Sequence, residues 1–226
     1  ASDVNLVNLE SPVAQSGDPL PEKPYTFRAV PDALAAITSA WVNVVSLANN
    51  HALDFGVNAF LETLSALEAA GIEVAGAGRD MGEAYSPAVV GARGLRVAVL
   101  AFTDTLAVPP RYVPLWEAGP DKPGVATLTD EERVLRAVAQ ASASADVVVV
   151  SFHWGYEYLS HPTPSQRRLG RAAVDAGAAL VVGHHPHVPQ GVELYRGAVI
   201  AYSLGNLVFH PYDRRASRSA VLVARV

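Results

Sequence analysis

The sequence predicts an α/β fold, with one domain spanning residues 1–226. Short β-branched and apolar runs alternate with segments of helical periodicity, which is typical of strands joined by helices in a mostly parallel sheet. Two further pairs of runs are separated only by short glycine-containing turns, which predicts hairpins and a second sheet packed on the first. His, Asn and Glu residues follow several apolar runs, and open α/β sheets bind ligands at such strand ends.

In the first half of the chain, one amphipathic helix stands out among short strands. Phe60, Leu61, Leu64 and Leu67 recur at helical spacing, and Gly71 follows them as a helix stop. The elements expected in order are a strand at 4–7, a proline-rich loop at 11–31, a helix at 32–40, a strand at 41–47, this helix at 57–70, a strand at 72–75, and a hairpin of strands 87–90 and 95–102.

Two capping boxes mark the helices of the second half. Thr129 with Glu132, and Thr163 with Gln166, each have the spacing in which two side chains satisfy the first helical N–H groups. The elements expected in order are a loop at 103–128, a helix at 129–144, a strand at 146–152, a helix at 163–177, a strand at 179–182, a hairpin of strands 191–195 and 198–203, a polar loop at 210–219 and a final strand at 220–226.

Composition excludes several classes of protein. The net charge of −5 gives no general attraction to nucleic acid, so we expect no nucleic-acid partner. The chain has no cysteine, which excludes disulfides and thiolate chemistry. Its apolar runs are far shorter than the roughly 20 residues that cross a bilayer, so no transmembrane segment is expected. The start at Ala1 lacks signal-peptide character and lacks Met, which predicts a mature or trimmed product.

The segment from Gly183 to His187 is the sharpest local signal. His185 and His187 flank Pro186, which restrains the backbone, so both imidazoles can reach one metal centre. Gly183 is expected to permit a tight turn off the preceding strand. His184 is expected to point the opposite way, because neighbouring side chains alternate in an extended segment. The alternative is a His-rich surface loop.

Asn50, His51 and Asp54 follow another predicted strand. Asn50 can offer an amide oxygen to a metal, and His51 can act as a general acid or stabilise a developing oxyanion. Asp54 can accept a hydrogen bond from His51 and fix its tautomer. The alternative is that Asn49, Asn50 and Asp54 only cap and start the helix at 57–70.

Other candidates carry weaker signals. His153, at the end of the strand 146–152, is a metal-ligand candidate, although a lone His there is often a core residue. Glu10 is the carboxylate near the first strand end, and a bridging carboxylate suits a two-metal site. His161 is a candidate for substrate contact.

Two polar features late in the chain are candidates for the substrate pocket. Asn206 follows the strand 198–203 and is expected to line it. Arg214, with Arg215 and Arg218, could hold an anionic substrate, but such a run is more often a solvated loop.

Five motifs in order resemble the bacterial CapA family, the capsule or poly-γ-glutamate synthesis proteins related to the calcineurin-like metallophosphoesterases. The resemblance spans nearly the whole chain and implies an α-β-β-α sandwich of two mixed sheets flanked by helices. The motifs are Asn8-Leu9-Glu10, Ser46-Leu47-Ala48-Asn49-Asn50-His51-Ala52-Leu53-Asp54-Phe55-Gly56, Phe152-His153-Trp154-Gly155, Gly183-His184-His185-Pro186-His187 and Tyr202-Ser203-Leu204-Gly205-Asn206-Leu207.

The resemblance also implies roles for individual residues. Asn50 and His51 look like the superfamily's Asn-His pair, and His153 looks like its isolated His ligand. His185 and His187 look like its His-x-His pair, and Glu10 like the bridging carboxylate. The family pattern opens with an upstream strand ending in Gly-Asp, which this chain does not contain. The expectation is therefore an N-terminally incomplete domain that lacks the first strand and one ligand.

The function implied is a metal-dependent hydrolase, phosphoesterase-like, linked to capsule or poly-γ-glutamate metabolism. Two divalent transition-metal ions, Mn, Fe or Zn, are the expected cofactors, bound weakly or not at all if the missing ligand matters. The expected substrate is an anionic small molecule or polymer, and the resemblance implies an extracytoplasmic or cell-envelope location. The alternatives are a non-catalytic polymer-binding module with a degenerate metal site, and a metal-assisted isomerase or epimerase.

Overall fold

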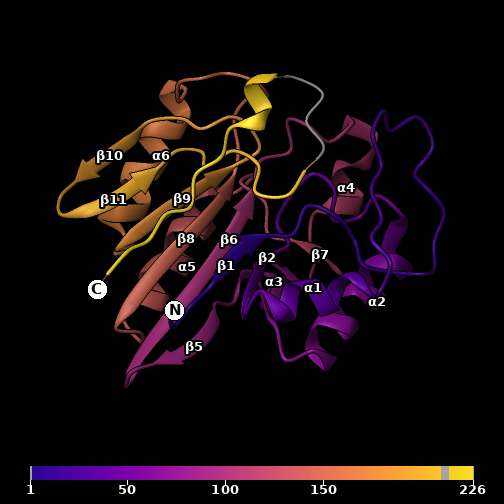
Figure 1. The fold of residues 1–226 in the computed structure, drawn as a ribbon, viewed down its shortest axis with the longest axis horizontal. Helices are drawn as coiled ribbons and strands as arrows, with labels where there is room; N and C mark the ends of the chain where they lie inside the picture. The colour runs from indigo at the N-terminus through magenta and orange to yellow at the C-terminus, as the bar shows by residue number, and fades with distance from the viewer. Residues whose placement is uncertain (1, 210–213, 226) are drawn as a thin grey trace.

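The computed structural model describes residues 2–209 and 214–225, and its largest element is a six-stranded mixed sheet (Figure 1). Its strands are β5 (Ala88–Ala92), β6 (Leu95–Thr103), β8 (Val147–His153), β9 (Leu180–His184), β10 (Val192–Tyr195) and β11 (Ala198–Ala201). The order across the sheet is β10-β11-β9-β8-β6-β5. The four central strands run parallel, and the two hairpins expected from the sequence supply antiparallel edge strands.

A second, three-stranded sheet is parallel throughout. It contains β1 (Leu6–Asn8), β2 (Val44–Ser46) and β3 (Glu73–Ala75), in that order. A minor antiparallel pair, β4 (Ala77–Gly78) with β7 (Gly124–Val125), lies outside both main sheets. Because the connected strands are parallel, the residues that follow them emerge at the carboxyl edge of each sheet, where α/β proteins bind ligands.

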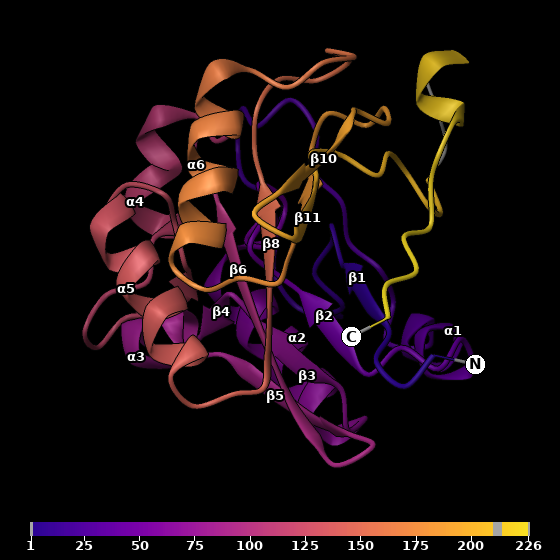
Figure 2. The same cartoon turned by 90° about the vertical axis from the view of Figure 1, so that its left-hand side faces the viewer.

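Helices cover the outer faces of the two sheets, which gives four layers (Figure 2). Helices α5 and α6 pack Val138 and Leu169 against the larger sheet, and the aromatic ring of Phe152 belongs to the same core. Helix α2 contributes Phe60 to a second core, which also contains Val45 of the smaller sheet and Val99 of the larger one. The helices are α1 (Ala33–Ser39), α2 (Gly56–Ala69), α3 (Met81–Tyr85), α4 (Val113–Trp116), α5 (Glu131–Ser142) and α6 (Pro164–Asp175), with short 3-10 helices η1 (Pro110–Tyr112) and η2 (Arg214–Ser217).

Most of the predicted elements are present, and the expected mixed α/β class is confirmed. Helix α2 ends as expected, because Gly71 adopts a left-handed φ of 68° directly after it. The capping box of α6 is formed by Thr163 and Gln166. No helix in the described part of the chain has both the length and the apolar character of a membrane span.

Three predictions about local structure were wrong. The cap of α5 is Asp130, whose side chain accepts from the Arg133 amide, while Thr129 bonds to Glu117 instead. The segment 103–128 contains η1, α4 and β7, so it is not simply a loop. Residues 220–225 form no strand: the pairing stops at the bridge of Gly205 to Ser219 and the hydrogen bond from the Ala220 amide to the Leu204 carbonyl. Residue 226 lies outside the described residues.

Gly183 was expected to make a tight turn, and the structure assigns it a different role. It lies within β9, where a Cβ atom would come 1.9 Å from the Tyr202 carbonyl oxygen and 2.6 Å from Trp154 Nε1. These two atoms form a hydrogen bond of 3.0 Å over the glycine. The turn itself is made by His185, which has a φ of 93°. Glycine is therefore required because the Tyr202 carbonyl and the Trp154 indole, which follow the two neighbouring strands, close over this position.

We predict that Gly183→Ala lowers the free energy of unfolding by about 2–4 kcal/mol, because the new methyl group displaces backbone rather than a flexible side chain. The matched control is Gly91→Ala in β5, where a Cβ meets nothing within 4 Å. That control should change stability by less than about 1 kcal/mol. Denaturant unfolding of both variants measures the difference, and equal effects would contradict the close approach at Gly183.

Candidate metal centre

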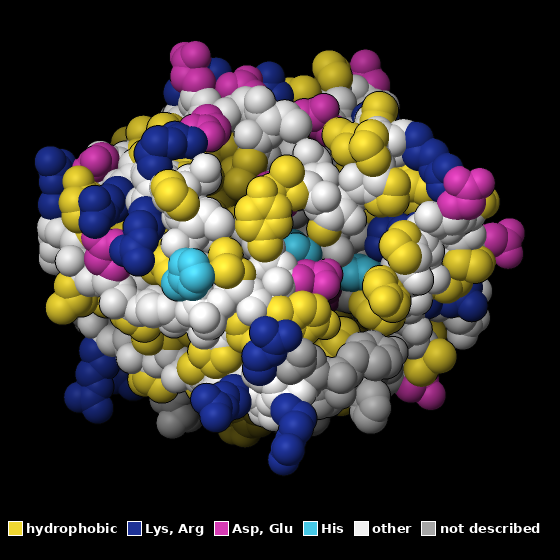
Figure 3. Space-filling model, turned by 90° about the horizontal axis from the view of Figure 1, so that it is seen from above, with side chains coloured by type: hydrophobic (Ala, Val, Ile, Leu, Met, Phe, Trp, Pro, Cys, Tyr) yellow, Lys and Arg dark blue, Asp and Glu magenta, His cyan; other side chains and the backbone are white. Residues whose placement is uncertain are grey.

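Polar residues from both sheets meet at the carboxyl edges of the parallel strands. Glu10 follows β1, Asn50 follows β2, His153 ends β8, and His185 and His187 follow β9. Viewed from above, His and acidic side chains lie in a hollow rimmed by hydrophobic side chains (Figure 3). Four chain segments far apart in sequence therefore build one site.

The Glu10 carboxylate lies at the middle of this cluster. Its Oε1 atom is 3.5 Å from His153 Nε2 and 3.8 Å from His187 Nε2. Asn50 Oδ1 is 2.7 Å from His153 Nε2. The His185 ring centroid lies 4.9 Å from that of His153 and 5.9 Å from that of His187. The five residues that the sequence nominated as metal ligands thus lie together.

Two amides orient members of the cluster. Asn8 Nδ2 donates to Glu10 Oε2 at 2.9 Å, which leaves Oε1 directed at the imidazoles. Asn206 Oδ1 lies 2.8 Å from His187 Nδ1, so this nitrogen carries the proton in the neutral ring and Nε2 keeps its lone pair. A second hydrogen bond, from Asn206 Nδ2 to the Ala216 carbonyl, fixes the amide. Asn206 therefore holds His187 in the orientation that suits a metal ligand.

Burial disfavours the charged form of His153 and His185 in the cluster and of the neighbouring His184. Desolvation lowers the pKa of His185 to about 3 and that of His184 to about 4, and it holds the pKa of His153 well below its usual range. Burial also raises the pKa of Glu10, and the negative charge of Glu157 adds to the increase, although nearby imidazoles oppose it. Neutral imidazoles and an under-neutralised carboxylate form an environment that favours a cation.

The donor set fits a divalent metal ion. One ligand atom each from Glu10, His185 and His187 lie within 4.8 Å of one another. Donors that share one ion lie roughly 3–4 Å apart, because each is about 2 Å from the ion. Glu10 Oε1, His153 Nδ1 and His185 Nδ1 are buried without hydrogen-bond partners among the described residues. Imidazole and carboxylate donors suit Zn, Mn or Fe, and unpaired buried donors of this kind call for a ligand.

His51 and Asp54 form a second group beside the cluster. His51 Nδ1 lies 2.6 Å from Asp54 Oδ2, and both side chains are buried. Helix α2 has Phe55 at its N-cap and no side-chain capping bond, so Asp54 is not the helix cap that the alternative interpretation proposed. Its Oδ2 atom instead also accepts from the Phe27 amide at 2.7 Å. The Phe27 ring packs on His51 with centroids 4.4 Å apart.

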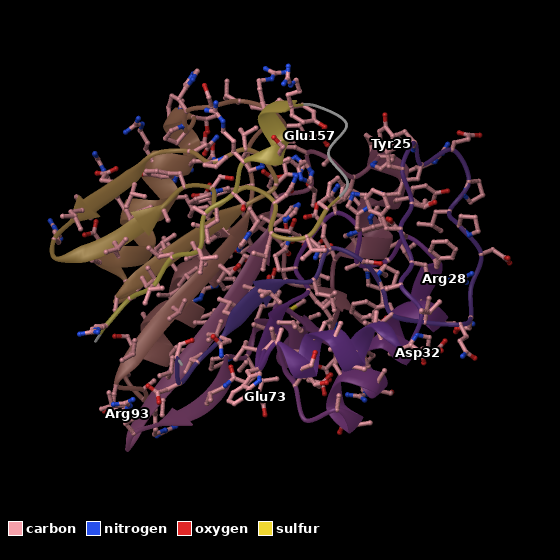
Figure 4. The ribbon with its side chains drawn as sticks, viewed as in Figure 1. Tyr25, Arg28, Asp32, Glu73, Arg93 and Glu157 are labelled. Atoms are coloured by element: carbon pink, nitrogen blue, oxygen red, sulfur yellow. The ribbon has the colours of Figure 1, made fainter. Side chains whose placement is uncertain are left out.

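Two residues nominated for substrate contact lie apart from these groups. His161 and Arg214 are exposed, and neither side chain hydrogen-bonds to the described residues of the cluster. Arg215 lies over the Tyr158 ring, and that ring in turn lies 6.3 Å from His187. Glu157 lies in the same loop as Tyr158, at the upper edge of the molecule in Figure 4.

Several residues that surround the site could not be recognised from the sequence. Lys23 contacts both Asp54 and His51, and Phe209 stacks on His187 with centroids 5.3 Å apart. Both lie in segments without periodicity, so no local signal marked them. Asn8 was quoted only as part of a motif, although its direct bond to Glu10 follows from their i, i+2 spacing on one face of a strand.

Comparison with known proteins assigns the chain to a family. Residues 1–211 match the family described as bacterial capsule synthesis protein PGA_cap. The chain belongs to the PGA_cap family. It is 35% identical to the PGA biosynthesis protein CapA of Bacillus subtilis over 98% of this chain and 57% of the relative. It is also 35% identical to the capsule biosynthesis protein CapA of Bacillus anthracis, over 89% of this chain and 48% of the relative.

The chain is also similar to a mycobacterial protein and to one solved structure. A probable polyglutamine synthesis accessory protein of Mycobacterium tuberculosis is 34% identical over 92% of this chain and 56% of the relative. The chain spans about half the length of these curated PGA_cap relatives. A crystal structure of a hypothetical protein from Thermus thermophilus superimposes with a TM-score of 0.51 at 18% identity, covering 90% of this chain and 65% of that one. This last likeness concerns the fold alone.

We predict that His185→Ala lowers bound Zn or Mn at least tenfold, because it removes one of the three clustered donors. The matched control is His161→Ala, which removes an exposed imidazole and should leave metal content unchanged. Elemental analysis after metal loading and gel filtration measures both variants. Equal metal content in wild type and His185→Ala would remove His185 from the centre.

Proposed function

We propose that this chain is a metal-dependent hydrolase of metallophosphoesterase type that acts on an anionic substrate in capsule or poly-γ-glutamate metabolism. The observation that carries the proposal is the group of Glu10, His185 and His187 beside the buried His51–Asp54 pair. A metal site and an acid–base pair in one hollow are the two parts that metal-assisted hydrolysis requires. The four-layer arrangement of two sheets supports a metallophosphoesterase-like domain.

The proposed ligands are Glu10, Asn50, His153, His185 and His187. When bound there, divalent Mn, Fe or Zn ions would supply Lewis acidity and lower the pKa of water to roughly 7. Burial keeps the imidazoles of His153 and His185 neutral, so that neither has to lose a proton when the ion binds. Asn8 and Asn206 hold the carboxylate and one imidazole in place.

His51 is the proposed general acid. Asp54 accepts the hydrogen bond of its Nδ1–H group, so the proton exchanged with a substrate is carried on Nε2. Adjacent Asn50 contacts His153, which places His51 beside the proposed metal ligands. Protonated Nε2 would donate to the leaving-group oxygen while the Phe27 ring limits the movement of the imidazole.

The substrate class follows from charge and from the relatives. The hollow holds the carboxylate of Glu10, on which the negative charge of the exposed Glu157 also acts, so an anionic substrate needs the metal to offset this charge. Arg215, at the rim beside Tyr158, can hold a second anionic group. The relatives are named for PGA, capsule and polyglutamine synthesis, which supports an extracytoplasmic or cell-envelope location for this chain.

We predict that chelator-treated protein regains hydrolysis when Mn, Zn or Fe(II) is added, and that His51→Asn lowers kcat by about 10²–10⁴-fold at unchanged metal content. Phosphomonoester, phosphodiester and γ-glutamyl peptide substrates test the phosphoester and γ-glutamyl amide bonds that such a hydrolase could cleave. Release of phosphate, alcohol or glutamate measures turnover.

Two outcomes would contradict the proposal. Tight binding of poly-γ-glutamate without bond cleavage, in metal-loaded protein, would make the chain a binding module. Inversion of a substrate stereocentre without hydrolysis would instead indicate a metal-assisted epimerase.

A further inference from the structure

Lys23 is a buried cation that neither the family motifs nor the proposed chemistry assigns. The chain has only two lysines, Lys23 and Lys122. The Lys23 side chain is 3% exposed, although it lies in a proline-rich loop without regular structure. Lysine is almost never this deeply buried unless it is paired. Its contacts should therefore identify its role.

The Lys23 ammonium group has two acceptors and lies close to His51. Nζ lies 2.8 Å from Asp54 Oδ1 and donates to the Tyr25 carbonyl at 2.8 Å. It also lies 3.3 Å from His51 Nδ1, which is a close approach and not a hydrogen bond when that nitrogen donates its proton to Asp54. The Trp116 ring closes the remaining side, with its centroid 5.9 Å from Nζ.

We propose that Lys23 is a positioning residue for His51 and acts through Asp54. This role rests on the proposed function, in which His51 is the general acid. The two carboxylate oxygens of Asp54 have different interaction partners. Oδ2 takes the His51 ring and the Phe27 amide, whereas Oδ1 is buried and is balanced by the Lys23 charge.

Removal of Lys23 would leave Asp54 Oδ1 as an uncompensated buried charge. Loss of one member of a buried ion pair is strongly unfavourable, because the remaining charge keeps its desolvation penalty. The carboxylate would then turn toward another donor and release His51 Nδ1. The same ammonium ties the loop at Tyr25, so the Phe27 ring would also lose its fixed place over His51.

Two other roles for Lys23 agree less well with the structure. A substrate-binding cation must reach the ligand, and a side chain that is 3% exposed beneath its own loop does not. A simple loop anchor needs only the Tyr25 carbonyl, and it gives no reason for the contacts to Asp54 and His51. The side chain of Tyr25 itself is exposed, in the upper right of the molecule (Figure 4).

A double-mutant cycle separates these roles. Lys23→Met, Asp54→Asn and the combined variant are compared with wild type, and Lys122→Met is the matched control because the Lys122 ammonium donates to the Pro114 carbonyl at the surface. Lys23→Met should lower kcat at least tenfold at unchanged metal content and nearly unchanged KM. In the Asp54→Asn background the same change should lower kcat less than twofold. Equal effects in both backgrounds would overturn the proposal.

A second readout is independent of turnover. In ¹⁵N-histidine-labelled protein, the short contact of His51 Nδ1 to Asp54 predicts a slowly exchanging low-field proton. It should persist in Lys122→Met and disappear or shift in Lys23→Met. An unchanged resonance in Lys23→Met would overturn the proposal even if no substrate is turned over, so failure of the hydrolase proposal is distinguishable from failure of this one.

The combined variant covers the case in which Lys23→Met does not fold. It leaves no unpaired buried charge, so folding of the double variant where the single variant unfolds would support the pairing with Asp54. Unfolding of both would show that Lys23 holds the loop independently of Asp54, and that result would overturn the proposal.

Discussion

A buried carboxylate among neutral imidazoles is the interaction on which the site depends. Glu10 Oε1 has no hydrogen bond within the described part of the chain and lies within 4 Å of two imidazole nitrogens. Burial raises the pKa of Glu10, and it also lowers the pKa of His153 and His185, so these two imidazoles stay neutral beside the carboxylate. A divalent ion would satisfy the carboxylate and the free lone pairs together. The geometry, the charge balance and the donor types therefore all favour the same occupant.

The turn that carries the clustered imidazoles after β9 has a strained backbone. His185 and His187 both have positive φ values, 93° and 57°, which are uncommon for residues with a Cβ. The turn between them is held by the Tyr158 amide, which donates to the Pro186 carbonyl at 2.8 Å. Beneath it, Gly183 lets Tyr202 and Trp154 approach β9 closely. The Tyr158 hydrogen bond and the close packing at Gly183 thus fix the strained turn, so that both imidazoles are held at the Glu10 cluster.

Periodicity and topology explain what the sequence could predict. Helical spacing marked α2, and the rule that parallel strands place their following residues on one edge brought Glu10, His153 and His185 together in prediction and in structure. The strand predicted at 220–226 from the alternation around Val221 and Val223 is absent from the described residues. Both of these side chains are largely exposed, so their alternation does not mark a buried face. Lys23 was missed because its burial depends on the path of a loop, and no local pattern records that path.

The most direct test of a cation at Glu10 is anomalous diffraction from crystals of the metal-loaded protein. The account predicts a peak within about 2.0–2.3 Å of a Glu10 oxygen and of imidazole nitrogens from His185 and His187. A metal peak elsewhere on the molecule, with the Glu10 cluster containing only ordered water at full metal loading, would contradict it.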